Sequence, residues 1–147
     1  DILIVDKTGT LTEGRPAFHA MISAGSLAPN EILRLAASLD QGSEHPLAQA
    51  IVAEARKREL KLSPAIDFES ASGIGVRGKV DNHFVALGNT ALMEEQKVEW
   101  RTVANEAETL RSKGARVIYL AVDGLLAGLL AVADPVGRHA GVLPVAG

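Results

Sequence analysis

Ser43-Glu44-His45-Pro46-Leu47 (SEHPL) stands between two runs of helical periodicity and organises the chain around it. Proline is favoured at the first position of a helix, because its missing N–H would be unpaired there and its φ already suits a helix. The apolar residues that follow keep helical spacing. The stretch therefore predicts a helix that begins at Pro46, with His45 at or beside the N-cap. An imidazole and a carboxylate at a helix start can meet a planar, hydrogen-bonding ligand, or they can simply occupy the surface there.

The composition limits the classes of protein to consider. The 147 residues suffice for one domain with a hydrophobic core, which must be aliphatic because only 3% of the residues are aromatic. The formal net charge of −3, with acids and bases interspersed, argues against nucleic acid or an anionic membrane as a direct partner. The absence of cysteine excludes disulfides and thiolate metal sites and permits a cytosolic location, and no signal peptide is expected.

A possible site of chemistry lies upstream of SEHPL. Residues 1–5 (DILIV) predict a buried parallel strand, followed by residues 6–14 (DKTGTLTEG). Ligands of α/β folds bind at the C-terminal ends of such strands. There Asp6 can act as a nucleophile toward a phosphoryl group, while Lys7 and Thr8 can surround the phosphate oxygens. DKTGTLTEG resembles the phosphorylation signature of the P-type ATPases, in which the aspartate takes the γ-phosphate of ATP.

The rest of the chain mixes strand and helix patterns. Helices are predicted at 30–39, 46–59, 91–95 and 98–112, and strands at 17–23, 66–70, 76–80, 84–87, 116–122 and 125–132. Asn30 is the expected N-cap of the first helix. Asp123-Gly124 predicts a type I′ turn, so that the apolar run 117–133 forms two buried strands rather than a membrane span.

The glycines of Gly73-Ile74-Gly75-Val76-Arg77-Gly78 have the spacing G-x-G-x-x-G. The residues after them alternate as in a strand, whereas a Rossmann motif would open a helix. We therefore expect these glycines on a sheet or at its edge, where the missing Cβ lets the backbone approach a ligand closely. A β-bulge without a ligand is the alternative.

The motifs DKTGT, SEHPL, GIGVRG, GN and ADPV occur in this order. Together they resemble the heavy-metal-transporting branch of the P-type ATPases, most of all its copper-exporting members, up to about residue 136. The resemblance implies an α+β fold, with a twisted antiparallel sheet flanked by helical hairpins and inserted into an α/β haloacid-dehalogenase-like phosphorylation domain. It assigns residues 1–13 to the start of the phosphorylation domain, 14–132 to the nucleotide-binding domain, and 133–147 to a truncated return and an unassigned tail.

The same resemblance implies a set of residues that contact ATP or ADP: Asp40, Glu44, His45, Gly73, Gly75 and Asn89. The adenine would lie near His45, with Glu44 supporting the histidine. The two glycines would line the path of the nucleotide, and Asn89 would be a polar contact. Asp40 replaces the glutamate usual in the family, and its shorter side chain requires an inward shift of the loop or a bridging water.

For the chemical step, the resemblance implies that Asp6 is phosphorylated, supported by Lys7 and Thr8, and that Asp6 and Thr8 hold Mg²⁺ in the complete pump. The partners would be the remaining phosphorylation, actuator and transmembrane domains, with this segment on the cytoplasmic side. Copper(I) is the favoured cargo and zinc the second choice. The family's later TGD and GDGxND motifs do not occur in this sequence. We therefore expect the isolated chain to bind nucleotide without efficient turnover or transport.

Other functions remain open at this point. A stand-alone haloacid-dehalogenase-type phosphatase would use a second aspartate two positions after the nucleophile, where this chain has Thr8. A non-catalytic nucleotide-sensing module is a further alternative. The four histidines (His19, His45, His83 and His139) do not have the spacing of a metal cluster.

Overall fold

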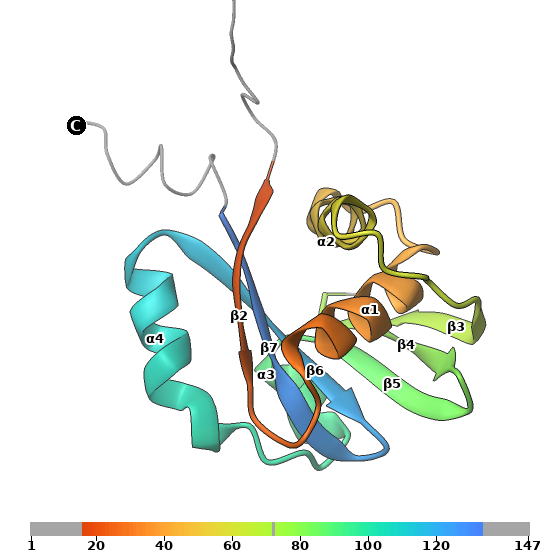
Figure 1. The fold of residues 1–147 in the computed structure, drawn as a ribbon. Coiled ribbons are helices and arrows are strands. Elements are labelled where there is room, and N and C mark those ends of the chain that lie inside the picture. Colours follow the sequence, from red (N-terminus) through yellow and green to blue (C-terminus); the bar gives the residue numbers. More distant parts are fainter. Residues whose placement is uncertain (1–15, 72, 134–147) are drawn as a thin grey trace, which may run out of the picture.

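The computed structural model describes residues 16–71 and 73–133. Six strands form one antiparallel sheet in the order β2-β7-β6-β5-β4-β3 (Figure 1). The strands are β2 (Ala17–Ser23), β3 (Ala65–Ala71), β4 (Gly75–Val80), β5 (His83–Gly88), β6 (Ala115–Val122) and β7 (Leu125–Ala133). The helices are α1 (Pro29–Asp40), α2 (Pro46–Lys57), α3 (Thr90–Glu95) and α4 (Ala104–Ser112), with a 3₁₀ turn at Arg101–Val103. The predicted α+β fold with an antiparallel sheet is confirmed.

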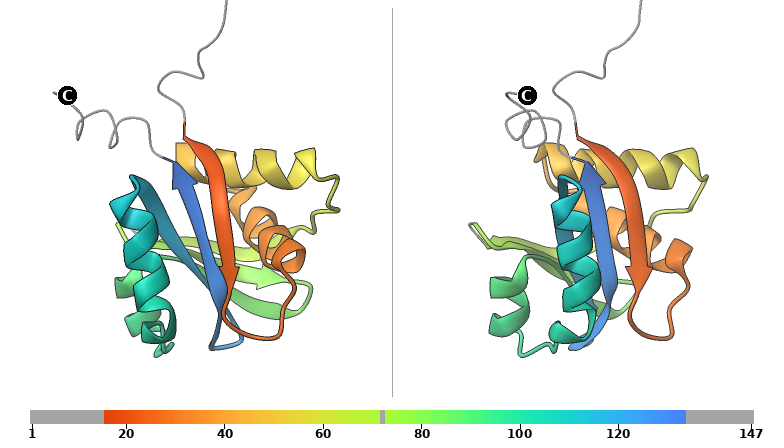
Figure 2. Two further views of the ribbon diagram at one scale, coloured as in Figure 1. Left: turned by 60° about the vertical axis from the view of Figure 1, so that its left-hand side comes forward. Right: turned by 90° about the vertical axis from the view of Figure 1, so that its left-hand side faces the viewer.

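The two faces of the sheet carry separate hydrophobic cores. Helices α1 and α2 cover one face, and α3 and α4 cover the other (Figure 2). Strand β6 supplies both cores by alternation, because Leu120 packs toward α1 and α2 while Tyr119 packs toward α3 and α4. Each fully buried aliphatic side chain contributes about 1.5–3 kcal/mol through burial. Because the sheet is buried on both faces, the apolar run 117–133 forms strands in which nearly every side chain can be apolar.

The turn between β6 and β7 has the predicted form. Asp123 and Gly124 have φ of 54° and 83°, as a type I′ turn requires. The Asp123 carboxylate accepts hydrogen bonds from the Phe84 amide at 2.9 Å and pairs with His83 at 2.7 Å. Within residues 16–71 and 73–133, no helix is long and apolar enough to cross a membrane.

Two local predictions are wrong. Helix α1 begins at Pro29 with Ala28 as its N-cap, because proline fixes the helix start one residue before Asn30. The Asn30 side chain instead accepts a hydrogen bond from Arg58 at 2.8 Å. The helix predicted at 98–112 becomes α-helical only at residue 104, because Lys97 has a φ of 59° and Val98 is buried in the core as part of the preceding loop.

The first and last described strands lie side by side, with Ala17 paired to Ala133. Both chain segments that continue beyond the described fold therefore leave it at the same end of the sheet. The strand predicted at 1–5, the DKTGT loop and the tail 137–147 lie outside the described residues. The domain boundaries at residues 13 and 132 stay predictions.

Candidate functional site

A cleft of about 430 Å³ opens where helices α1 and α2 meet the sheet. Its walls come from the end of α1, the start of α2, the β3–β4 connection, the end of β5 and the start of β6. It is large enough for a small organic ligand. The lining includes five of the six residues predicted to contact nucleotide: Asp40, His45, Gly73, Gly75 and Asn89. The sixth, Glu44, is exposed and does not line the cleft.

His45 is the N-cap of α2, as the sequence predicts. Its Nδ1 accepts a hydrogen bond from the Leu47 amide at 3.1 Å, and its own backbone N–H donates to Ser43 Oγ at 3.2 Å. Because Nδ1 accepts, the ring hydrogen resides on Nε2, which leaves Nε2–H as a donor for a ligand. In the described part of the chain, Glu44 forms no hydrogen bond with His45. The ring is held by the Leu47 amide instead, while Ser43 holds the backbone of His45.

The two glycines of the β3–β4 connection have different reasons for lacking a side chain. Gly73 has a φ of +81°, and a Cβ there would meet nothing within 4 Å. Gly75 faces Gly88 across the β4–β5 ladder, and a Cβ on Gly75 would lie 2.4 Å from the Leu87 carbonyl oxygen. Gly73 therefore leaves open space at the cleft, whereas the space beside Gly75 is filled by the protein itself.

Asn89 connects two walls of the cleft. Its Oδ1 accepts a hydrogen bond from the Leu92 amide at 3.1 Å and caps α3, while its Nδ2 donates to the Gly73 carbonyl at 3.2 Å. The side chain thus holds the glycine connection in place against the end of β5. A positioning role for Asn89 accompanies any direct contact with a ligand.

Asp40 is the buried acid of the cleft. The residue is 4% exposed, and burial raises the pKa of its carboxyl to about 7. Within residues 16–71 and 73–133 the carboxyl has no hydrogen-bond partner. Its backbone carbonyl accepts from the Ser43 amide at 2.9 Å and so starts the turn into SEHPL.

Three residues at the start of β6, Arg116, Val117 and Ile118, also line the cleft and were not predicted to do so. Arg116 shares the sheet face of Ile118 and Leu120, because side chains two apart on a strand point to the same side. This face thus changes from apolar to cationic toward the strand start. An arginine that begins an otherwise apolar strand was the available signal, although only the sheet order places it at the cleft.

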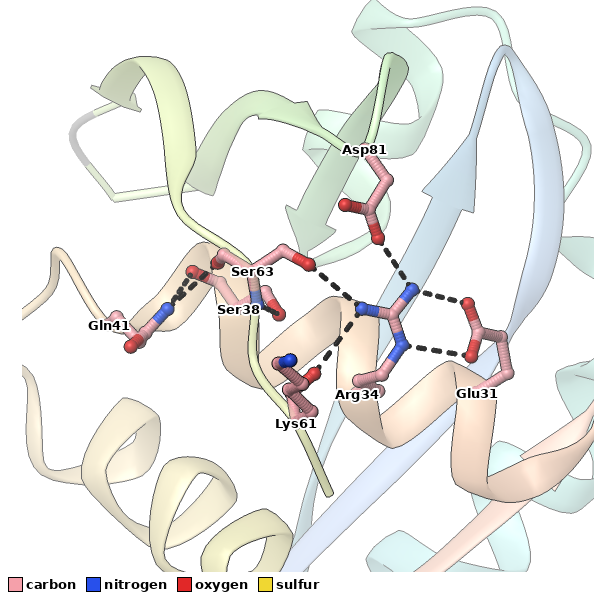
Figure 3. A network of polar contacts seen from close by, with 7 residues as sticks. All are labelled: Glu31, Arg34, Ser38, Gln41, Lys61, Ser63 and Asp81. Carbon is pink, nitrogen blue, oxygen red and sulfur yellow. Dashed lines mark hydrogen bonds and ion pairs between the residues drawn. The ribbon is translucent and has the colours of Figure 1, made fainter.

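A polar network centred on Arg34 fixes the orientation of α1 (Figure 3). Arg34 forms a bidentate ion pair with Glu31, with N···O distances of 2.7 and 2.9 Å. One of its guanidinium nitrogens also pairs with the Asp81 carboxylate at 2.7 Å. Arg34 also donates to Ser63 Oγ at 3.1 Å, and the Ser63 amide donates to the buried Ser38 Oγ at 3.0 Å. These contacts bind α1 to the segment before β3 and to the β4–β5 turn. They hold the C-terminal end of α1, and hence Asp40, in its place.

The predicted catalytic residues Asp6, Lys7 and Thr8 lie outside the described residues, as does their predicted Mg²⁺ site. Among the residues that are described, no three acidic, histidine or cysteine side chains gather as a metal site would require.

Comparison with known proteins places this geometry in a family context. Residues 1–139 match the sequence model of the haloacid dehalogenase-like hydrolases. A copper-transporting P-type ATPase of Rhizobium leguminosarum bv. viciae is 46% identical over 134 residues, which are 91% of this chain and 16% of the relative. The chain therefore spans about a sixth of the length of that curated relative.

Three solved structures share the fold. A zinc-transporting PIB-type ATPase has a TM-score of 0.75 at 33% identity, over 86% of this chain and 20% of that chain. The N-domain of HMA6, a copper-transporting P-type ATPase, has a TM-score of 0.69 at 26% identity, over 80% of this chain and 98% of that chain. The catalytic domain of the CPx-ATPase CopB-B has a TM-score of 0.58 at 27% identity, over 86% of this chain and 41% of that chain. That structure concerns conformational changes of the domain upon nucleotide binding. These matches confirm the resemblance drawn from the motifs.

Proposed function

This chain belongs to the haloacid dehalogenase-like hydrolase family, and from that premise we propose that residues 14–132 are the ATP-binding domain of a heavy-metal-translocating P-type ATPase. Residues 1–13 and 133–147 would then belong to its phosphorylation domain. One observation carries the proposal, namely that Gly73 lines the same cleft as Asp40 and His45, which lie much earlier in the sequence, and that this cleft is large enough for a nucleotide base.

The adenine would enter between His45 and the glycine connection. Leu47, Ile74 and Leu87 offer apolar surface for the purine ring, and the Nε2–H of His45 offers a hydrogen-bond donor. Gly73 supplies the space for a close approach, because nothing fills the position of its missing side chain. The cleft thus combines apolar side chains with a few fixed polar groups, as purine sites do.

The phosphates would extend past Arg116 toward the end of the sheet where the chain continues to the DKTGT loop. The guanidinium gives the cleft a positive group, which favours the polyphosphate electrostatically. Asp6 would receive the γ-phosphoryl group after the domains close, with Lys7 and Thr8 beside the phosphate oxygens. The oxygen donors of Asp6 and Thr8 are of the kind that Mg²⁺ prefers, and the ion would neutralise phosphate charge there.

The complete protein would use this cycle to move a metal ion through transmembrane segments coupled to actuator and phosphorylation domains. This segment would face the cytoplasm. Copper(I) is the preferred cargo, because the copper-transporting relative shares 46% of the aligned residues. Zinc is the second choice, supported by the structural likeness to a zinc-transporting ATPase.

The test is an NMR titration of the chain with ATP and with ADP. We expect shifts at His45, Gly73 and Asn89, and a loss of affinity of about three- to tenfold in His45→Ala, because one hydrogen bond and part of a stacking surface disappear. His19→Ala is the matched control, since His19 is exposed on β2 at the far edge of the sheet. Unchanged ATP affinity in His45→Ala would show that the cleft is assigned wrongly.

A stand-alone phosphatase is the second candidate, because the matching family is one of hydrolases. Such an enzyme needs a carboxyl two positions after the nucleophile to activate water, and Thr8 occupies that position. We expect no turnover of p-nitrophenyl phosphate with Mg²⁺ present. Multiple turnovers that disappear in Asp6→Asn would favour the phosphatase over the pump.

A further inference from the structure

The starting observation is a pair of glycines that face each other across two neighbouring strands at the cleft. Gly75 of β4 pairs with Gly88 of β5, and both residues line the cleft. A Cβ built on either glycine would lie 2.8 Å from Cδ2 of Leu92, which is closer than two such carbon atoms can approach. Leu92 of α3 therefore occupies the space that side chains at these two positions would need.

Leu92 reaches the glycine pair from the other face of the sheet. Its side chain is fully buried in the core beneath α3 and α4, whereas the end of α1 and the start of α2 form walls of the cleft on the opposite face (Figure 2). Because glycine has no side chain, only the backbone of Gly75 and Gly88 can separate Leu92 from the cleft at this point.

The cap of the same helix holds the adjoining connection between β3 and β4. The backbone N–H of Asn89 donates to the Ile74 carbonyl at 3.0 Å, and its Nδ2 donates to the Gly73 carbonyl at 3.2 Å. Its Oδ1 accepts from the Leu92 amide at 3.1 Å. The start of α3 thus contacts the connection through polar groups at Asn89 and through apolar packing at Leu92. A glycine backbone has no side chain to anchor it, so its position depends on such neighbours.

We propose that Leu92 is a positioning residue of the nucleotide site. It packs against Gly75 and Gly88 from behind and holds the glycine connection where ATP contacts it, although Leu92 itself does not line the cleft. The inference rests on the nucleotide-binding function proposed above and extends that site through the sheet to α3. When this support is removed, the connection occupies its binding position for only part of the time, and the apparent affinity falls by that fraction.

Leu92→Ala removes the support, and Leu110→Ala is its matched control. Leu110 of α4 is buried in the same core as Leu92 and does not line the cleft. Both variants lose the same atoms from the same core, so both lower the stability of the domain. Only Leu92→Ala also removes the atom that approaches the glycine pair. Leu92→Met is the conservative variant, because methionine retains the volume of leucine.

The experiment is an NMR titration of the folded chain and of each folded variant with ATP. We expect Leu92→Ala to bind ATP about five- to tenfold more weakly, because the connection then holds its binding position for about a tenth to a fifth of the time. Leu110→Ala and Leu92→Met should bind within about twofold of the unaltered chain. In spectra without ATP, the Gly73 and Gly75 amide signals should move in Leu92→Ala and stay in place in Leu110→Ala. A loss of stability alone would not separate these two variants.

Two results would overturn this inference while leaving the nucleotide site in place. One is an equal ATP affinity in Leu92→Ala and Leu110→Ala. The other is weaker binding by Leu92→Ala with the two glycine signals unmoved, since the connection would then still be in position. If Leu92→Ala does not fold, Leu92→Val and Leu110→Val repeat the comparison with a smaller truncation and an expected difference of about twofold. If the unaltered chain binds no ATP, the proposed function itself is wrong, and the inference fails with it.

Discussion

The buried carboxyl of Asp40 should make the stability of the ligand-free domain depend on pH in an unusual direction. Its pKa in the folded chain, about 7, lies well above the ordinary aspartate value of 3.8. Because the folded chain holds this proton more tightly, its stabilising contribution is complete below about pH 4 and is lost as the pH rises through about 7. Between those values the free energy of unfolding falls by about 1.4 kcal/mol per pH unit.

Between pH 5 and pH 8 the loss amounts to about 2.5 kcal/mol, a large share of the stability of a small domain. Asp81 and Asp123 do not interfere in this range. Hydrogen bonds from Arg34 and from His83 lower the pKa of Asp81 and of Asp123, respectively. The stabilisation from these two carboxylates is therefore lost only when the pH falls below about 4.

The assay is urea unfolding of the chain at pH 5, 6, 7 and 8, followed by Trp100 fluorescence. Trp100 packs edge-on against the buried Tyr119 with ring centroids 6.0 Å apart, so its emission should change when the core opens. Asp40→Asn should remove the loss between pH 5 and pH 8. Asp67→Asn, which makes the same chemical change at an exposed position of β3, should retain the loss. The reasoning is refuted if Asp40→Asn and the unaltered chain show the same change across this range.

Three further variants test the walls of the cleft. Gly88→Ala should prevent folding or destabilise by more than about 3 kcal/mol, because the new Cβ would lie 2.1 Å from the Ile74 carbonyl oxygen; a stable variant by urea unfolding would contradict this. Gly73→Ala should lower the free energy of unfolding by only about 1 kcal/mol, because the backbone φ there is +81°. The same variant should weaken ATP binding in the NMR titration, and an unchanged affinity would mean that the nucleotide binds elsewhere. Asn89→Ala should lose about 1 kcal/mol with the α3 cap, and if the Gly73 resonance in NMR spectra then stayed unmoved, the proposed positioning role would be wrong.

Local chemistry explains which parts of this protein could be predicted from its sequence. The start of α2 follows from the fixed φ of Pro46, and the cap at His45 requires only groups within two residues of it. The turn at Asp123-Gly124 likewise needs only two residues that tolerate positive φ. The wrong N-cap prediction for α1 also has a local cause. Pro29 occupies the first helical position, so the N-cap is Ala28 and Asn30 already lies inside the helix.

The roles of the glycines could not be separated in the sequence. Gly73 and Gly75 look alike in the motif, yet Gly73 faces open space and Gly75 is packed against the backbone of β5. The difference arises from the β4–β5 register, which places Gly75 opposite Gly88. A one-residue change of register would no longer pair Gly75 with Gly88, and it would turn the side chains of the shifted strand to the other face of the sheet.

The sequence by itself determined the helix start, the tight turns and the motifs that identify the family, because each depends on a few neighbouring residues. Only the tertiary structure decided that Arg116 lines the same cleft as His45. The strand order β2-β7-β6-β5-β4-β3 places the last two strands of the sequence between β2 and β5. The tertiary structure also decided the burial of Asp40. Proton affinity at such a site depends on how much water the surrounding elements exclude, and those elements are assembled from segments up to about 80 residues apart.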